Sequence, residues 1–137
     1  INDNMGQYVA SQVIKRMISA DISPKSARVL VLGLAFKENC PDLRNTRVVD
    51  IVSELTSYGS RVDVHDPWVD AAEAKAEYGI DLVAEPEPGA YDSIVIAVGH
   101  RKFAELGAAG IRRFGKPSSL VYDIKYVLPQ GAADDRL

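Results

Sequence analysis

The sequence is short of the features that mark disulfide-stapled, nucleic-acid-binding and membrane proteins. Its 137 residues include a single cysteine, Cys40, so no disulfide can form within the chain. Basic residues are not in excess, because 16 lysines and arginines stand against 19 aspartates and glutamates and leave a net charge of −3. A domain that binds nucleic-acid phosphates shows the opposite balance. The longest apolar runs, residues 29–36 and 94–99, are much too short to span a membrane. We therefore expect one soluble, cytoplasmic domain that binds no nucleic acid and has no membrane span.

Several common catalytic patterns are also missing. No pair of histidines or cysteines has the spacing of metal ligands, and no Ser-His-Asp arrangement stands out. The loop after the first expected strand begins at the single glycine Gly33, and the next helix starts about ten residues too late for the glycine-rich turn of a dinucleotide-binding motif. These residues therefore define neither a metal site nor a serine-type active site.

The apolar residues predict alternating helices and strands. Two runs, residues 29–34 and 94–98, are unbroken aliphatic segments of the kind that is buried on both faces of a parallel sheet. We therefore expect an α/β fold, a Rossmann-like doubly wound and mostly parallel sheet with helices on both faces, in which these runs form the central strands. The pattern places helices at residues 4–20, 48–58, 70–78 and 103–114, and strands at residues 28–35, 61–65, 80–83, 93–98 and 120–122.

The sequence also makes a prediction for each end of the chain. The first helix has no strand before it, so we expect the chain to begin partway through a larger protein. Residues 1–22 are then the end of an adjoining central helix, and residues 23–137 are the domain itself. Residues 130–137 have no periodic apolar pattern and are expected to be frayed.

One loop concentrates positive charge at the edge of the sheet where ligands bind in doubly wound folds, beyond the carboxyl ends of the strands. The loop at residues 36–45 brings Lys37, Arg44 and Arg47 close to the N-terminus of the next helix. Free backbone amides, the helix dipole and cationic side chains together attract anions, so these residues indicate a site for a phosphate-bearing ligand. The pattern leaves open the alternative that these cations are surface charges paired with nearby carboxylates.

Other side chains near the expected strand ends have two interpretations each. Asp66 stands where Rossmann-type domains hold a ribose hydroxyl, but without a glycine-rich turn we favour a turn-starting role. His100 either faces a ligand or caps a strand end, and Lys125 either contacts an anionic or hydroxylated ligand or lies on the surface. Trp68 either stacks on a base or packs against its neighbours. Cys40 has no histidine near it in sequence and is expected to be a tolerated neutral residue.

The loop residues resemble a known motif. The run from Gly33 to Arg47 reads Gly-Leu-Ala-Phe-Lys-Glu-Asn-Cys-Pro-Asp-Leu-Arg-Asn-Thr-Arg and is similar to the Gly-x-x-Phe-Lys-x-x-x-x-Asp-x-Arg motif of the UDP-glucose/GDP-mannose dehydrogenase family. The step Asp66-Pro67 resembles the Tyr-Asp-Pro step that follows in this family, and residues 1–5 resemble the end of its long central helix. The residues of the motif resemble those in the branch of the family that acts on UDP-N-acetylhexosamines, including capsule and O-antigen enzymes.

This resemblance implies the C-terminal UDP-binding domain of an NAD-dependent enzyme, one that oxidises the 6-hydroxyl of a nucleotide sugar to a carboxylate for polysaccharide biosynthesis. By the same resemblance, Phe36 and Lys37 contact the nucleotide sugar, and Lys125 adds a further substrate contact. Arg44 reaches NAD across the cleft between domains. Many members carry threonine at the position of Cys40, so this cysteine is not expected to be catalytic.

The resemblance also implies parts that this chain does not carry. The family's catalytic cysteine and lysine and its glycine-rich NAD-binding turn belong to preceding domains, so we expect no catalytic residue here and no activity of this chain alone. The expected partners are a UDP-sugar, NAD, the remaining domains of the same polypeptide, and a second subunit in a homodimer or higher homo-oligomer formed through the central domain. The alternative is a free-standing nucleotide-binding or partner-recruiting module without catalysis.

Overall fold

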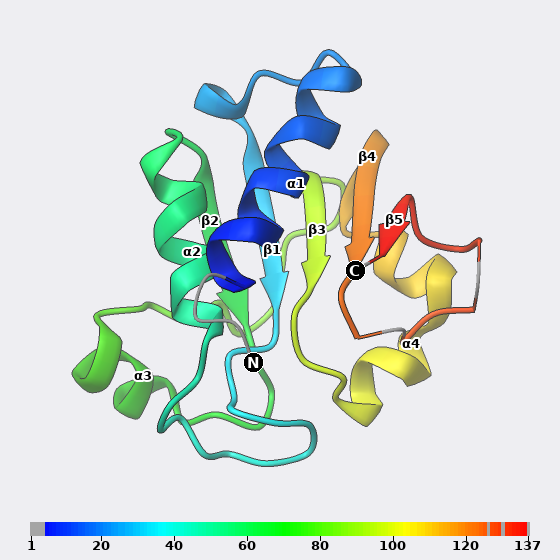
Figure 1. Ribbon diagram of the computed structural model, residues 1–137. Coiled ribbons are helices and arrows are strands. Elements are labelled where there is room, and N and C mark those ends of the chain that lie inside the picture. Colours follow the sequence, from blue (N-terminus) through cyan, green and yellow to red (C-terminus); the bar gives the residue numbers. More distant parts are fainter. Residues whose placement is uncertain (1–4, 126, 130, 137) are drawn as a thin grey trace.

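The computed structural model describes residues 5–125, 127–129 and 131–136 and contains a five-stranded parallel sheet (Figure 1). The strand order is β2-β1-β3-β4-β5. The strands are β1 (Arg28–Leu32), β2 (Arg61–His65), β3 (Tyr91–Ile96), β4 (Gly115–Asp123) and β5 (Asp135–Arg136). The predicted α/β fold is confirmed, and the two apolar runs supply β1 and β3, which both lie inside the sheet.

Helices cover both faces of the sheet. On one face lie α1 (Met5–Ser19) and α2 (Val48–Ser57), and on the other lies α4 (Arg101–Arg112) (Figure 1). The short α3 (Ala71–Tyr78) follows β2; the Asp70 side chain caps its start, and Gly79 ends it in the left-handed conformation. A 3-10 turn, η1 (Pro24–Ser26), joins α1 to β1. The three layers are those that alternating strands and helices predict.

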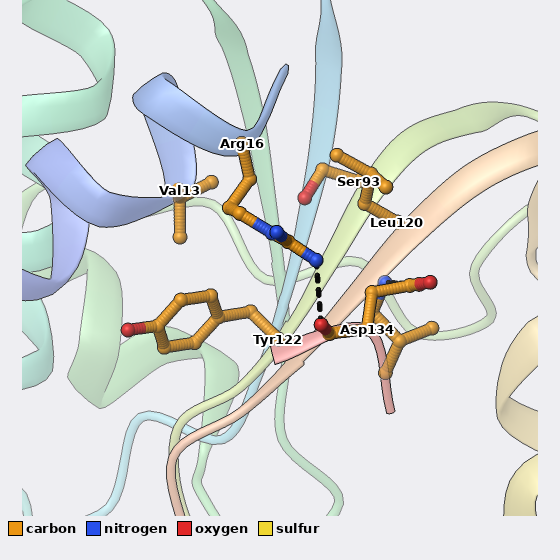
Figure 2. A pocket seen from close by; sticks show the side chains of 7 residues that line it. Val13, Arg16, Ser93, Leu120, Tyr122 and Asp134 are labelled. Atoms are coloured by element: carbon orange, nitrogen blue, oxygen red, sulfur yellow. Dashed lines mark hydrogen bonds between the residues drawn. The ribbon is translucent and has the colours of Figure 1, made fainter. Parts of the chain in front are cut away.

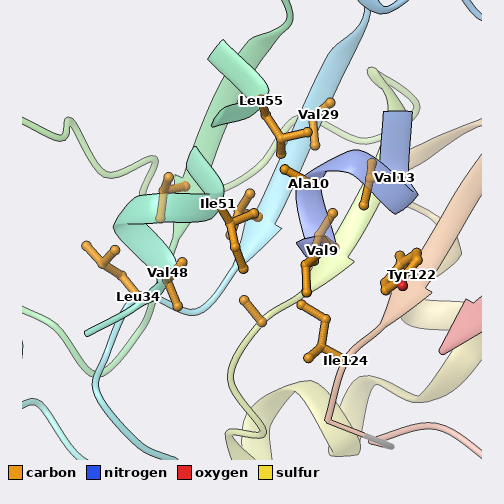
Figure 3. Packing of buried hydrophobic residues seen from close by; sticks show 14 of the residues in the cluster. Val9, Ala10, Val13, Val29, Leu34, Val48, Ile51, Leu55, Tyr122 and Ile124 are labelled. Atoms are coloured by element: carbon orange, nitrogen blue, oxygen red, sulfur yellow. The ribbon is translucent and has the colours of Figure 1, made fainter. Parts of the chain in front are cut away.

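Strand β1 is apolar at successive positions because both of its faces are buried. Along β1, Val29 and Val31 belong to a cluster with side chains of α1 and α2, whereas Leu30 and Leu32 belong to a cluster with α4. All four residues are fully shielded from solvent. Figure 3 shows the first of these clusters, in which side chains of α1 and α2 meet above the sheet.

The direction of the chain along the sheet reverses at β1. The α2 connection leads from β1 to β2, and the next strand, β3, lies on the opposite side of β1. From β3 the chain passes through α4, which covers the other face of the sheet, to β4. Strand β4 lies next to β3, on the side away from β1. The loops that follow β1 and β3 therefore diverge at the carboxyl edge of the sheet, which is the position of the ligand-binding crevice in doubly wound folds.

The prediction that residues 130–137 are frayed is wrong for the part that the structure describes. Strand β5 pairs with β4 in parallel, and the preceding Asp134 anchors it by an ion pair with Arg112 at 3.1 Å. Arg16 of α1 donates a hydrogen bond to the Asp134 carbonyl oxygen at 2.7 Å, beside a cavity of about 10 Å³ that is at the lower limit for one water (Figure 2). A two-residue strand carries no periodic signal, so the sequence pattern does not indicate it.

Several predicted elements differ in extent from the observed ones. The strands expected at residues 28–35 and 93–98 are β1 (Arg28–Leu32) and β3 (Tyr91–Ile96). The strand expected at residues 120–122 is the end of the longer β4, and the helix expected at residues 103–114 is α4, which starts earlier and is kinked at a glycine with φ 67°. Residues 80–83 form no strand; an isolated bridge joins Leu82 to Val64 of β2. Short segments of this kind carry too few residues to show a period.

No helix within the described ranges is long and apolar enough to cross a membrane. Residues 1–4, which contain most of the run that resembles the end of a central helix, lie outside the described residues.

Gly33 directly follows β1 at a point where a side chain does not fit. Its φ is +104°, and a Cβ built there lies 2.5 Å from the Val98 Cβ and 2.9 Å from the Val98 backbone nitrogen. We expect Gly33→Ala to lower the free energy of unfolding by about 2–4 kcal/mol, through backbone strain and overpacking. Gly79 is the matched control, because its φ is also positive (+69°) but nothing lies within 4 Å; Gly79→Ala should cost about 1–2 kcal/mol. Urea unfolding measures both variants, and equal losses would contradict the packing account.

Candidate functional site

A cavity of about 410 Å³ opens at the carboxyl edge of the sheet. Its walls come from segments far apart in the sequence: residues 35–38 after β1, residues 45–48 at the start of α2, residues 97–98 after β3 and residues 124–125 after β4. Side chains of α1 and α2 complete it. Both its place and its volume are those of small-molecule sites in doubly wound folds.

Three of the four predicted ligand-binding residues meet in this cavity. Phe36 and Lys37 line it from the loop after β1, and Lys125 lines it from the loop after β4. Phe36 is 53% exposed, so its ring offers apolar surface to a ligand. Arg44, the fourth predicted residue, is not part of the wall, whereas Arg47 is.

The cavity wall combines apolar surface with an excess of positive charge. Its cations are Lys37, Arg47 and Lys125, and Glu38 is the carboxylate among the lining residues. Within the described residues, neither Lys37 nor Lys125 is joined to a carboxylate by an ion pair. The apolar lining residues are Val9, Ala35, Phe36, Val48, Ile51, Ala97, Val98 and Ile124. This surface suits a ligand that has both a ring and an anionic group.

The N-terminus of α2 lies in the same wall. Thr46, Arg47 and Val48 all line the cavity, and the Thr46 hydroxyl accepts the Val48 N–H at 3.2 Å. The positive end of the helix dipole adds to the attraction that the cationic side chains exert on an anion. Of the three cations expected beside this helix N-terminus, Lys37 and Arg47 therefore line the cavity, and Arg44 does not.

Arg44 forms a two-pronged contact with Asp42. Its Nε and Nη2 each lie 3.1 Å from an oxygen of the Asp42 carboxylate, and its side chain is 85% exposed. Hydrogen bonds from the Arg44 side chain and backbone hold the pKa of Asp42 below its usual value of 3.8. The sequence left open the alternative that these cations pair with nearby carboxylates, and the structure shows such a pair for Arg44. The Arg44 side chain is exposed to solvent, where ion pairs add little to stability.

The buried carboxylate of Asp66 connects three loops at the same edge. Its Oδ2 accepts the backbone N–H of Leu34 at 2.7 Å and of Ala35 at 2.9 Å, both after β1. Its Oδ1 accepts the N–H of Trp68 at 2.8 Å, a contact that fits the predicted turn-starting role. His100, after β3, lies with Nε2 at 3.0 Å from Oδ2. No local sequence pattern indicates the links from Asp66 to the other two loops.

Hydrogen bonding decides the charge state of Asp66. Burial alone would raise the pKa of this carboxyl, because a charge in apolar surroundings loses its hydration. The hydrogen bonds from His100, Leu34, Ala35 and Trp68 outweigh burial and hold the pKa of Asp66 below its usual value of 3.8. The side chains of Asp66 and His100 are both fully shielded from solvent, so the charge depends on these donors.

A second buried carboxylate, Asp123, shapes the loop after β4. It is 0% exposed and accepts the backbone N–H groups of Lys125 at 3.2 Å, Val127 at 3.1 Å and Leu128 at 2.8 Å. These contacts fix the backbone that carries Lys125. Asp66 and Asp123 were not predicted as site residues in this sense, although an aspartate at the carboxyl end of a strand is a signal that could have marked both.

Cys40 and Trp68 are not among the residues that line the cavity. Cys40 is a half-buried free thiol in the loop after β1. Trp68 is 43% exposed, and the centroid of its ring lies 6.2 Å from that of His100. The Trp68 ring thus packs beside a buried histidine with part of its surface in solvent.

Comparison with known proteins gives this geometry a family context. The model of the UDP binding domain of the UDP-glucose/GDP-mannose dehydrogenase family matches residues 30–130. The chain is 53% identical over all of its 137 residues to a UDP-N-acetyl-D-glucosamine 6-dehydrogenase from Salmonella typhi, and 54% identical over the same length to one from Pseudomonas aeruginosa. It spans 32% of the length of each of these relatives.

A solved structure supports the fold in the same way. The NDP-N-acetyl-D-galactosaminuronic acid dehydrogenase from Methanosarcina mazei superposes with a TM-score of 0.81 at 23% identity, over 93% of this chain and 26% of that one. At this level of identity the likeness concerns the fold alone.

The role of Asp66 predicts a pH-dependent effect of its amide variant. Asp66→Asn turns one acceptor oxygen into a donor that faces other donors, so we expect a loss of about 3 kcal/mol in unfolding free energy near pH 7. Because the folded pKa is depressed, the stabilisation is present above the unfolded pKa and is lost as pH falls through the folded pKa. The gap between wild type and variant should therefore narrow below about pH 4. Denaturant unfolding from pH 3 to 7 measures it, with the partly exposed Asp42→Asn as a control of much smaller effect. A gap that stays constant with pH would contradict the assigned charge.

Proposed function

The chain belongs to the UDP-glucose/GDP-mannose dehydrogenase family, and on this premise we propose that it is the nucleotide-sugar-binding domain of an NAD-dependent UDP-sugar 6-dehydrogenase. The reaction oxidises the sugar 6-hydroxyl to a carboxylate and yields a UDP-uronic acid for polysaccharide biosynthesis. The relatives from Salmonella typhi and Pseudomonas aeruginosa both act, by name, on UDP-N-acetyl-D-glucosamine. That nucleotide sugar is therefore the first substrate to test.

One observation carries the proposal: the cavity unites Phe36, Lys37 and Lys125 at the carboxyl edge of the sheet. A UDP-sugar carries two phosphates and several rings, and its anionic centre needs cations that are not already neutralised. Lys37 and Lys125 meet that need from two separate loops, while Phe36 offers a ring face. In this proposal Lys37 and Lys125 hold the diphosphate side of the substrate, and Phe36 packs against its sugar side.

We propose that Arg44 serves a different ligand, NAD, held mainly by another domain. A guanidinium has five N–H donors, and the contact with Asp42 engages two of its nitrogens, so donors remain for an anionic group. The side chain is 85% exposed, which fits a contact made across a domain boundary. When bound, NAD supplies the hydride acceptor for the oxidation. Arg44 itself would hold and orient the cofactor and take no part in proton transfer.

The domain division follows from the same proposal. Residues 1–22 would be the end of a helix from a preceding central domain, and residues 23–137 would be the nucleotide-sugar-binding domain. Side chains of α1 pack into the sheet cluster, so this helix would join the two domains rigidly. The remaining domains would supply the catalytic residues and the contacts between subunits.

Two experiments test the function. Isothermal titration calorimetry of the chain with UDP should give saturable binding with one site, and UMP should bind more weakly because it lacks one phosphate. A chimaera in which this chain replaces the matching 32% of the Pseudomonas aeruginosa enzyme should reduce NAD with UDP-N-acetyl-D-glucosamine. UDP binding without activity of the chimaera would favour a binding module, and absence of UDP binding would overturn the proposal.

Lys37 and Arg44 should affect different ligands in that chimaera. Lys37→Ala should weaken UDP-sugar binding by about tenfold or more and leave NAD binding within about threefold, because Lys37 lines the cavity. Arg44→Ala should weaken NAD binding by about tenfold or more and leave UDP-sugar binding within about threefold, because Arg44 lies outside the cavity wall.

Separate titrations of UDP-sugar and NAD against both variants measure this split, with thermal melts as the control for folding. Equal losses for both ligands in both variants would mean that the loop acts only as one structural unit. Unchanged affinities for UDP-sugar and NAD in both variants would mean that Lys37 and Arg44 are surface charges that bind neither ligand.

A further inference from the structure

The loop that carries Lys37, here called the β1–α2 loop (residues 36–47), has two attachments outside itself that bear on its shape. Near its end, the Leu43 carbonyl oxygen accepts a hydrogen bond from the Tyr78 hydroxyl of α3 at 2.6 Å. Near its start, Asn39 contacts the segment after β3. At its base, the Phe36 N–H donates to the Asp42 carbonyl oxygen at 2.7 Å. Further along, Asn39 adopts a positive φ of 56°, and its N–H donates to Nδ1 of His100 at 2.8 Å. The Asn39 side-chain oxygen also accepts the Arg101 N–H at 2.9 Å. Asn39 therefore attaches the loop to the start of α4.

His100 supplies the buried half of this attachment. It is 0% exposed, its ring centroid lies 5.4 Å from that of Phe103, and it is not among the residues that line the cavity. Its Nε2 lies 3.0 Å from the Asp66 carboxylate, which can only accept in its charged form, so Nε2 carries the proton. Its Nδ1 accepts the Asn39 N–H and therefore carries none. His100 thus holds the loop in one tautomer.

His65 requires the opposite tautomer. Its Nδ1 lies 2.8 Å from the Val83 carbonyl oxygen, which can only accept, so this Nδ1 carries the proton. The chain has two histidines, and the two rings differ in which nitrogen is protonated. His65 is therefore an internal reference for the assignment of His100.

We propose that His100 is a positioning residue for the nucleotide site: through Asn39 it keeps the β1–α2 loop in the conformation that presents Phe36 and Lys37 to the cavity. The inference rests on the proposed function, since it assigns His100 a role in UDP binding. Lys37 is exposed and has no ion pair within the described residues, so its position is set by the backbone. Without its hydrogen bond to His100, Asn39 keeps only the contact of its side-chain oxygen with the Arg101 N–H. The part of the loop around Lys37 then populates other conformations more often, and the ligand must restore order at the expense of affinity.

Two substitutions of His100 separate its two contacts. The amide of His100→Gln reaches the position of Nε2 and keeps a donor for Asp66, but it leaves the Asn39 N–H without its acceptor. The oxygen of His100→Asn takes the position of Nδ1 and keeps that acceptor, but Asp66 loses a donor. Both variants lose the same ring packing on Phe103, so their stabilities both fall. We expect UDP affinity to drop about tenfold in His100→Gln and to recover to within about threefold in His100→Asn.

The measurements are calorimetry with UDP, amide hydrogen exchange and ¹⁵N spectra of the two imidazoles, all on the 137-residue chain. The Asn39 amide should exchange at least about tenfold faster in His100→Gln than in wild type, and it should stay protected in His100→Asn. The ¹⁵N spectrum of the wild type should show opposite tautomers for His65 and His100. His65→Gln is the control and should leave UDP affinity unchanged.

Each outcome bears on one claim. Equal UDP affinity in wild type and His100→Gln, with both proteins folded, overturns the positioning role, as does an equal loss in both His100 variants. If wild type fails to bind UDP, the proposed function fails, and the exchange of the Asn39 amide still decides whether His100 holds the loop. A His100 ring that carries its proton on Nδ1 would remove the basis of the inference.

Discussion

A buried negative charge organises the edge of this domain where its loops meet. The Asp66 carboxylate is fully shielded and receives hydrogen bonds from Leu34, Ala35, Trp68 and His100, which belong to the loops after β1, β2 and β3. A charge removed from water must keep its donors, because leaving it unpaired is far more costly than the net gain from any one of them. The three loops therefore cannot move independently, and the cavity has walls that are set before any ligand arrives.

The sheet order determines which loops can share that charge. With β1 and β3 adjacent and buried on both faces, their carboxyl ends meet at the same edge, and the connections to β2 and β4 leave in opposite directions. Asp123 holds the loop after β4 in place by accepting three backbone N–H groups, as Asp66 holds the loops after β1, β2 and β3. Lys37 and Lys125, far apart in sequence, thus enter one cavity on backbones that buried carboxylates hold in place.

Most of the fold and the position of the cavity can be predicted from the sequence, because they depend on local pattern. The unbroken apolar runs indicate interior strands, and strand ends indicate the edge that binds ligands. What the pattern does not reveal depends on contacts across space. The links from Asp66 to the loops after β1 and β3, the opposite tautomers of His65 and His100, and the pairing of β5 each require knowledge of which backbone or side chain lies opposite.

The central claim is that nucleotide binds in the cavity formed by the loops after β1, β3 and β4 and the start of α2. The most direct test is a titration of the ¹⁵N-labelled chain with UDP, followed by amide chemical shifts. The account predicts saturable shifts at residues 35–38, 45–48, 97–98 and 124–125, which line the cavity, and little change around Arg28 and Tyr91 at the opposite edge of the sheet. Shifts confined to that opposite edge, or none at saturating UDP, would contradict it.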